Sequence, residues 1–472
     1  MKRLTSILAM IVIILTASAQ RLLIVNDTVR IALNDIERIT IEKDTFFFNE
    51  LVDGKIANDP QITIFSKALK LTGLADSIKK YKESVYDIGN ENKESYEKIP
   101  FITQDYINVK WPNRIPTGFT VFVETDSIYR LNGINDIEDL KAYAKRIYDE
   151  VYPEDASIND PINRKNSLNR FVSYHILPFS ASYYDIACNY KLKEAGVYNY
   201  DNEDIYSYYE TMMPYSSLKV SIPFVATNKL YLNRRGLKSS AWVAGAKVEE
   251  TDNLCINGHY YYINDILTYG KEIQKKVFTE RRTMDTKTMS PTLMNVFLHT
   301  YLYGYETGKG IGLNQNMVIN FKADGNGHFI CQNVEKYAPY YDGDGFFCTD
   351  MENLTIKLPP LPEGKWQIRM GTTVHKDRAL VNTYIDDVLQ CENIDMSVSH
   401  TEEDFGKNGI EHAPANYYYH DNTLDELNSC ISFVVGTLTS DGHTDHFLRI
   451  EALTNYKVNL LDYFEFIPIT NE

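Results

Sequence analysis

The spacing of the apolar residues changes near the middle of this 472-residue chain. In the first half the pattern is mixed: Phe65, Leu69 and Leu74 recur near helical spacing, whereas residues 119–123 form a compact apolar run typical of a buried strand. From Asn316 onwards apolar and polar residues alternate, which is the period of a strand with one buried face. The chain also exceeds what one hydrophobic core usually supports, so we expect an α+β domain followed by an all-β domain.

Changes in composition suggest where these domains begin and end. We expect the first domain at residues 21–280, a connector at 281–315 and the β-domain at 316–472. The connector begins with Arg281-Arg282 and continues through threonine-rich turns to Met289-Ser290-Pro291.

Residues 1–19 are predicted to be a signal peptide. Lys2 and Arg3 precede a hydrophobic stretch over residues 7–15, and Ala17-Ser18-Ala19 supplies the small side chains that a signal peptidase accepts. The alternative, a transmembrane helix, would need roughly 20 apolar residues. We therefore expect an exported protein in the periplasm, at the cell surface or secreted, with no transmembrane segment after cleavage. No cysteine lies near the cleavage site, so a lipoprotein anchor is not expected.

The charge of the chain argues against nucleic acid as a partner. The formal net charge of −16 becomes −18 once the positive charges of Lys2 and Arg3 leave with the signal peptide. An acidic surface repels phosphates, and no block of Lys and Arg compensates locally.

The cysteines give no sign of a zinc site. They stand at positions 188, 255, 331, 348, 391 and 430, without CxxC or CxxH spacing. Six cysteines allow fifteen full disulfide pairings, and the sequence does not choose among them. In a chain of this size, sparse cysteines are more often buried thiols than a disulfide framework.

Three motifs in the first domain resemble those of the fasciclin family. Residues 120–126, Thr-Val-Phe-Val-Glu-Thr-Asp, resemble its TVFAPT-like run, although Glu124 stands in the region of the usual proline. Tyr174-His175 resembles the Tyr-His pair of the family. Residues 257–267, which begin with Asn257-Gly258, resemble its second motif, with departures at 260–262 and 264. The resemblance covers roughly half of the chain and implies an α+β fasciclin-type domain, a type used mostly in adhesion and binding. The domain is longer than is usual in the family, which implies insertions near residues 80–115 and 187–215.

The same resemblance implies structural roles for the motif residues. The Tyr-His pair is partly buried in the family, so we expect Tyr174 and His175 to pack and hydrogen-bond rather than to act as a base. Thr125-Asp126 is expected to cap the helix that follows the strand. We expect Asn257-Gly258 to have a structural role as well. Some relatives use the neighbourhood of the pair for cell adhesion, but the flanking residues here differ.

The second domain resembles another type of module. Residues 358–369, Leu-Pro-Pro-Leu-Pro-Glu-Gly-Lys-Trp-Gln-Ile-Arg, and the ending at 461–468 resemble galactose-binding-like jelly rolls. Turn signals such as Pro359-Pro360 and Asp441-Gly442 separate the alternating runs and indicate an antiparallel β-sandwich. Such modules often accompany fasciclin domains in surface proteins of glycan-foraging Gram-negative bacteria.

The sequence shows no established catalytic motif. It has no G-x-S-x-G elbow, no H-E-x-x-H helix and no complete P-loop. His443 and His446 could converge on a metal, but a solvated loop is the simpler interpretation. Residues 324–327 and 342–345 lack the spacing of a calcium loop and are interpreted as hairpin turns. We therefore expect no catalytic residue, no metal and no cofactor.

Tyrosine is unusually abundant, with 35 Tyr against 21 Phe and 3 Trp. Either the core is rich in tyrosine, or tyrosines form a surface for sugar or protein contacts. The best surface cluster lies in a long connection after Pro414. Its members, the predicted ligand-binding residues, are Asn416, Tyr417, Tyr418, Tyr419 and Asp421. The alternative is that these tyrosines only cover the end of the sandwich.

These observations predict an exported, non-catalytic binding or adhesion protein that captures a glycan or a cell-surface protein. One alternative is a carbohydrate-active enzyme with paired carboxylates in the sandwich domain, because any two acids at the right separation would serve. Another is a purely structural envelope protein. The ligand and the oligomeric state are left open.

Overall fold

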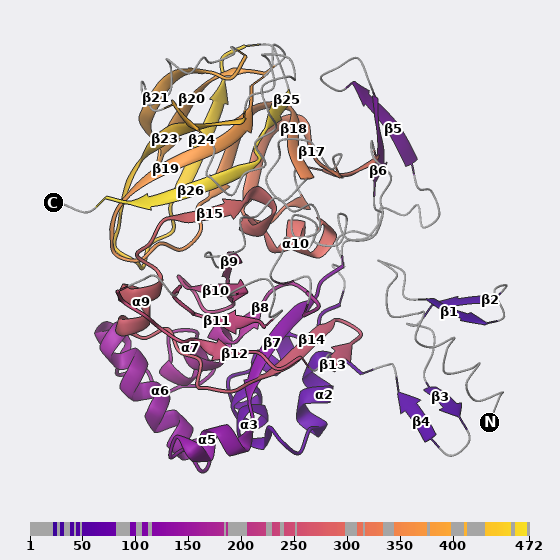
Figure 1. Cartoon of the computed structure of the whole chain (residues 1–472), viewed down its shortest axis with the longest axis vertical. Coiled ribbons are helices and arrows are strands. Elements are labelled where there is room, and N and C mark those ends of the chain that lie inside the picture. Colours follow the sequence, from indigo (N-terminus) through magenta and orange to yellow (C-terminus); the bar gives the residue numbers. More distant parts are fainter. Residues whose placement is uncertain are drawn as a thin grey trace.

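Helices gather in the amino-terminal part of the molecule, and antiparallel sheet dominates the rest. The computed structural model describes residues 50–81, 116–183, 186, 205–222, 229–236, 240–250, 253–297, 309–314, 317–333, 344–374, 378–397, 410–412, 430–454 and 458–469, together with strands at 22–25, 29–32, 38–41, 44–47, 95–100 and 106–111. Figure 1 shows a helix-rich body below and a sheet-rich body above. The fold is mixed α+β, and the signal peptide expected at residues 1–19 lies outside the described residues.

The helices of the first body follow the predicted apolar spacing. In α3 (Thr63–Leu71) the side chains of Ile64, Phe65 and Leu69 are buried, and Gly73 then adopts the left-handed conformation that separates this helix from the next. This confirms the helical spacing predicted from Phe65, Leu69 and Leu74. The remaining helices of this body are α2 (Val52–Asn58), α4 (Leu74–Ser77), α5 (Asp126–Leu131), α6 (Ile137–Val151), η4 (Pro153–Asp155), α7 (Ser167–Tyr174) and α9 (Lys271–Val277).

Two four-stranded sheets complete the first body. In one, β7 (Phe119–Glu124) is buried along its whole length and pairs in parallel with β14 (Gly258–Ile263), so that the two predicted motif strands are neighbours. Its outer strands are β8 (Ile176–Leu177) and β13 (Asn253–Cys255). The other sheet has the order β12 (Ala246–Lys247), β11 (Tyr231–Leu232), β10 (Ser217–Ile222) and β9 (Ile205–Glu210).

The second body consists of two larger sheets that contact each other. The Thr383 hydroxyl donates to the Val435 carbonyl oxygen at 2.7 Å, and Cys391 Sγ lies 3.4 Å from the Val434 carbonyl oxygen, so β20 and β21 of one sheet pack on β23 of the other. The five-stranded sheet has the order β15 (Arg282–Asp285), β26 (Tyr463–Pro468), β19 (Gly364–Thr373), β23 (Cys430–Ser440) and β22 (Ile410–His412). The nine-stranded sheet has the order β21 (Val388–Asp395), β20 (Leu380–Ile385), β24 (Phe447–Ala452), β18 (Asp344–Lys357), β17 (Phe321–Asn333), β16 (Lys309–Asn314), β6 (Tyr106–Trp111) and β5 (Ser95–Pro100), and β25 (Val458–Leu460) also pairs with β18.

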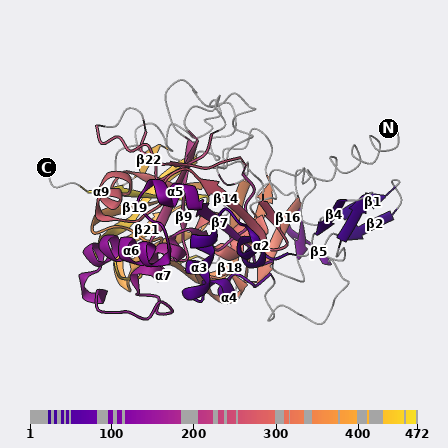
Figure 2. The same cartoon turned by 90° about the horizontal axis from the view of Figure 1, so that it is seen from below.

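Two segments lie elsewhere than the predicted boundaries imply. Strand β15, η6 (Thr286–Met289) and α10 (Pro291–Phe297) occupy the expected connector, and β15 pairs with β26 inside the second body. Strands β5 and β6 belong to the expected insertion of the first domain, yet β6 pairs in parallel with β16 of the nine-stranded sheet. The boundaries that composition indicated are wrong for these strands, because backbone hydrogen bonds join them to strands that are distant in sequence. Two small hairpins, β1–β2 and β3–β4 (22–47), lie beside these bodies in both views (Figures 1 and 2).

Arg282 joins the two bodies and is fully buried. Its guanidinium donates to the carbonyl oxygens of Phe278 and Pro360 at 2.6 and 3.1 Å. It also lies 5.0–5.3 Å from the ring centroids of Tyr208, Phe278 and Trp366. Burial lowers the pKa of Arg282. Because both bodies supply its partners, the junction is a packed interface rather than an exposed link.

Much of the tyrosine content serves the interior. The tyrosines among the largest fully buried side chains are Tyr129, Tyr148, Tyr174, Tyr208, Tyr209, Tyr261, Tyr269 and Tyr463. For these residues the interpretation as a tyrosine-rich core is confirmed. Cys348 and Cys391 are free thiols, and burial raises the pKa of Cys348 well above its ordinary value.

Candidate functional site

The predicted cap at the end of strand β7 is present and has a second function. The Thr125 hydroxyl accepts the Ile128 backbone N–H at 3.4 Å and caps α5. Asp126 points the other way: its carboxylate accepts the Thr63 hydroxyl at 2.6 Å and the Ile64 N–H at 3.0 Å. A carboxylate at the first turn of α3 is favourable because it satisfies donors that have no partner within the helix. Asp126 therefore fixes α3 to the strand.

A buried polar network lies where β7 meets α7. His175 Nε2 is 2.9 Å from Oε1 of Glu124, and both side chains are completely shielded from solvent. The same carboxylate accepts the Tyr129 hydroxyl at 2.8 Å and the Leu267 N–H at 2.9 Å. Burial, and then the charge of Glu124, raises the pKa of Tyr129 well above its ordinary value.

The protons of this network can be counted from its partners. His175 Nδ1 lies 2.7 Å from the Phe171 carbonyl oxygen, which only accepts, so Nδ1 must carry a proton. The contact between Nε2 and Glu124 then needs one more proton, held by either group. The polar groups of the network thus hydrogen-bond to one another. A general base must contact its substrate, whereas the side chains of Glu124 and His175 are shielded from solvent. The packing role of His175 stays a prediction.

Tyr174 joins the helical part to the neighbouring sheet. Its hydroxyl lies 3.0 Å from the carbonyl oxygen of Ser217 and 2.9 Å from Nδ2 of Asn233, and its ring packs against Tyr269 at a centroid distance of 5.2 Å. Burial raises the pKa of Tyr174 well above its ordinary value. The side chain is completely buried.

Asn257 holds three segments of the first body together. Its Oδ1 accepts the Val52 N–H at 2.9 Å, and its Nδ2 donates to the carbonyl oxygens of Ile78 and Lys80 at 2.6 and 2.8 Å. Gly258 follows with φ +149°, and a Cβ there would lie only 1.8 Å from the Phe119 carbonyl oxygen. Glycine is needed because the two parallel strands approach this closely.

Glu124 is the residue of this buried network whose role the motif comparison missed. The sequence shows it as a departure from the family pattern, whereas the structure places it at the centre of the buried network. One signal was available: an acid at the end of a continuous apolar run must have a buried partner, because an isolated buried charge is very costly. A histidine inside another apolar segment was the natural candidate.

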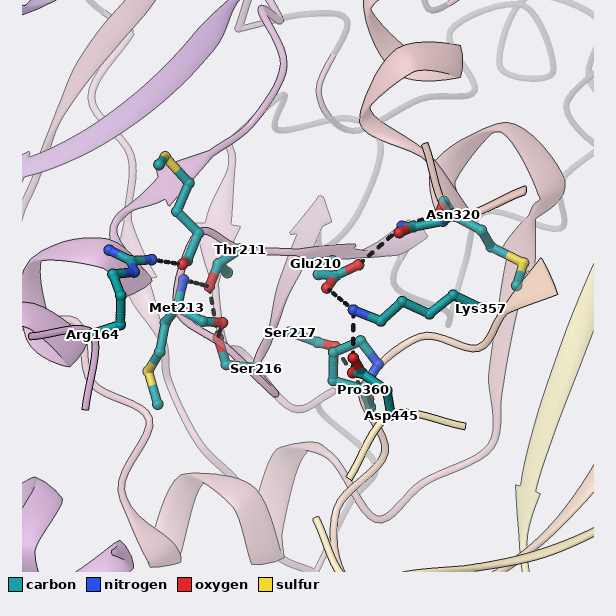
Figure 3. Close-up of polar contacts among 12 residues, drawn as sticks. Arg164, Glu210, Thr211, Met213, Ser216, Ser217, Asn320, Lys357, Pro360 and Asp445 are labelled. Atoms are coloured by element: carbon teal, nitrogen blue, oxygen red, sulfur yellow. Dashed lines mark hydrogen bonds and ion pairs between the residues drawn. The ribbon is translucent and has the colours of Figure 1, made fainter. Parts of the chain in front are cut away.

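A second polar cluster, which we call the interdomain bridge, lies between the bodies (Figure 3). Lys357 Nζ lies 3.1 Å from Glu210 Oε1 and 3.2 Å from Asp445 Oδ1. Asn320 Nδ2 donates to the other Glu210 oxygen at 3.3 Å. Burial alone would lower the pKa of Lys357, but the two carboxylates outweigh it and raise the pKa. The bridge joins β9 of the first body to β18 of the second.

Further hydrogen bonds surround this bridge. The Ser217 hydroxyl donates to the Pro360 carbonyl oxygen at 3.3 Å, and the Thr211 and Ser216 hydroxyls are 2.6 Å apart. Arg164 donates to the Met212 carbonyl oxygen from the opposite side (Figure 3). These contacts provide hydrogen-bond partners for polar groups of the turn between β9 and β10. We therefore interpret the cluster as part of the interface between the two bodies.

The two histidines considered as metal ligands have separate partners. The His443 ring packs edge-on against Tyr152 at 5.0 Å, whereas His446 Nδ1 lies 2.7 Å from Asp386 Oδ2. In the part of the chain that the structure describes, no three His, Cys, Asp or Glu side chains are grouped so that they could hold a metal ion.

The predicted hairpin turn at residues 324–327 is wrong. These residues lie within β17, where the pairing with β18 shifts register around Gly325. Glycine in a strand is typical of such a bulge. The predicted ligand-binding residues Asn416, Tyr417, Tyr418, Tyr419 and Asp421 lie outside the described residues.

Comparisons with known proteins give only weak similarities. No protein-family model matches the chain, and no curated protein matches it. A solved FAS1 domain pair from the insect cell adhesion molecule Fasciclin I is 14% identical, with TM-score 0.25, over 48% of this chain and 53% of that structure. The Cry4Aa toxin of Bacillus thuringiensis is 15% identical, with TM-score 0.20, over 34% and 24%. The insecticidal crystal protein Cry2Aa is 8% identical, with TM-score 0.21, over 73% and 69%.

The chain spans about half of the length of the fasciclin structure. TM-scores this low do not assign the chain to a family. Among the described helices, none has the length and apolar character needed to cross a bilayer.

Proposed function

We propose that this chain is an exported, non-catalytic binding or adhesion protein that captures glycans at the cell envelope. In this proposal the first body is a fasciclin-type domain with insertions, and the sheets of the second body are a galactose-binding-like jelly roll. The partner is a glycan or a glycosylated surface protein, and the location is the periplasm, the cell surface or the medium.

One observation carries the proposal: the polar residues of the three motifs serve the interior of the first body. Glu124 and His175 are fully shielded, Asp126 caps α3, and Asn257 bonds three segments. A framework of this kind supports binding by surface residues carried on a rigid scaffold.

A glycan array with the protein lacking residues 1–19 tests the proposal. We expect retention of at least one class of glycan, with no release of reducing sugar from that glycan on long incubation. Release of reducing sugar would favour the carbohydrate-active enzyme. Absence of retention on every glycan would favour the structural envelope protein. Fractionation of the native host tests the location, and recovery in the cytoplasm would contradict export.

A further inference from the structure

Trp242 is an exposed aromatic ring held in place from beneath. The residue is 46% exposed, whereas Trp366 is 1% exposed. The guanidinium carbon of Arg234 lies 4.9 Å from the Trp242 ring and 5.2 Å from the Tyr231 ring. Arg234 itself is buried, with 6% exposure. An arginine therefore contacts both aromatic rings, while much of the Trp242 indole faces solvent.

Local backbone geometry explains how these side chains meet. Side chains alternate between faces along a strand, which would place Tyr231 and Arg234 on opposite sides. Asn233 interrupts that alternation with φ +51°, and Arg234 comes to the side of Tyr231. Gly245 has φ +73°, and a Cβ there would lie 2.9 Å from Arg234 Cα and 2.4 Å from the Leu232 carbonyl oxygen. The glycine lets the second strand of the hairpin approach Arg234 closely.

Polar groups lie on the face of the hairpin that carries Tyr231. Lys247 pairs directly with Tyr231 across β11 and β12, and directly opposed residues project to the same face of a sheet. Lys247 Nζ lies 3.1 Å from the carboxylate of Glu249, and both side chains are partly exposed. The face that carries Tyr231 thus also holds an ammonium donor and a carboxylate acceptor that pair with each other.

We propose that Trp242 is a stacking platform for one pyranose ring of a neutral glycan. The inference rests on the glycan capture proposed above and gives it a site. A pyranose presents a face of C–H groups that packs on an indole, and its hydroxyls bond to polar groups at the rim. Contact with Arg234 fixes the indole before binding, which reduces the entropy lost on association. Lys247 is paired with Glu249 and Arg234 is buried, so neither of these cations is available to an acidic sugar, and a neutral sugar is favoured.

The test is affinity electrophoresis in gels that contain galactomannan, xylan, laminarin or polygalacturonate. The variants are Trp242→Ala, Trp242→Phe and, as a control, Phe447→Ala, since Phe447 is 43% exposed on the other body. We expect the wild type to be retarded by at least one neutral polysaccharide. Trp242→Ala should raise the Kd at least tenfold, about 1.4 kcal/mol, whereas Trp242→Phe and Phe447→Ala should stay near the wild type. Equal melting temperatures show that each variant is folded.

A second measurement reports directly on the ring. Oxidation by N-bromosuccinimide, localised by peptide mass spectrometry, should be slower at Trp242 when the retarding polysaccharide is present. Equal retardation of wild type and Trp242→Ala overturns the platform but leaves glycan capture standing. Retardation by polygalacturonate alone overturns the preference for neutral sugars. No retardation of the wild type in any gel overturns the platform, and absence of retention on the glycan array as well overturns the proposed function.

Discussion

The imidazole of His175 and the carboxylate of Glu124 meet at 2.9 Å in a site that solvent does not reach. The two residues are distant in sequence, and the contact joins the end of β7 to the end of α7. The Leu267 N–H brings a third segment to the same carboxylate. One buried polar contact therefore fixes the mutual positions of three parts of the first body.

We predict that His175→Phe destabilises the protein by about 3–5 kcal/mol, because it leaves the buried carboxyl of Glu124 without its imidazole partner. Phe keeps most of the ring volume, so the loss reports the polar contact more than a cavity. Urea unfolding followed by circular dichroism measures the change. The double variant Glu124→Gln/His175→Phe, which has no carboxylate left to isolate, should recover part of the lost stability. Strictly additive losses would contradict this interpretation.

Two substitutions of Tyr174 distinguish the contribution of ring packing from that of the hydroxyl's hydrogen bonds. Tyr174→Ala should cost about 3–5 kcal/mol, since it empties a fully buried ring site. Tyr174→Phe removes only the hydroxyl that contacts Ser217 and Asn233, and should cost about 1 kcal/mol. Thermal melts of the two variants measure the difference. Unchanged stability of Tyr174→Ala together with lost glycan retention would show that the residue is a binding contact instead.

Gly258→Ala should prevent the close approach of β14 to β7. The new Cβ would lie 1.8 Å from the Phe119 carbonyl oxygen, so the paired strands would have to shift. We expect a loss of about 3 kcal/mol or more, or failure to fold. Gly133→Ala is the matched control, because Gly133 has φ +77° with no atom within 4 Å of the new Cβ. Its cost should be only the backbone strain, about 1–2 kcal/mol. Similar losses in the two variants would refute the steric explanation.

Local sequence patterns were sufficient to predict the elements whose formation depends on residues adjacent in sequence. The buried strand at 119–123 and the cap at Thr125 each follow from a few adjacent residues. Strand alternation also indicated the sheets of the second body, whose Trp366 and Ile368 are buried.

The pairing of strands that are distant in sequence could not be predicted from the sequence. The partners of β6 and β15 stand far away along the chain, and no local pattern names them. The Glu124–His175 contact has the same character, since it joins two motifs that sequence reasoning treated separately. The Arg234–Trp242 contact depends on the positive φ of Asn233 and on the absence of a Cβ at Gly245, two backbone details that composition does not reveal.

The last prediction concerns stability at alkaline pH and the pair Tyr262 and Asp59. The Tyr262 hydroxyl donates to Asp59 Oδ2, as Tyr260 does at 2.9 Å. Burial, and then the hydrogen bond to Asp59 and its negative charge, raises the pKa of Tyr262 to about 12. An unfolded tyrosine loses its proton near pH 10. Between about pH 10 and pH 12 the folded state thus retains a proton that the unfolded state has released, and the free energy of unfolding must fall as the pH rises.

Tyr262→Phe should remove this contribution. Its urea midpoint should decline less steeply than that of the wild type above pH 10, whereas below pH 10 the two midpoints should differ by a constant amount. Absorbance at 295 nm gives the titration of Tyr262 itself, as the difference between wild type and Tyr262→Phe. The same difference measured in an Asp59→Asn background should move toward pH 10, because the negative acceptor is gone. A Tyr262 titration that is identical in both backgrounds would show that Asp59 does not raise the pKa of this tyrosine.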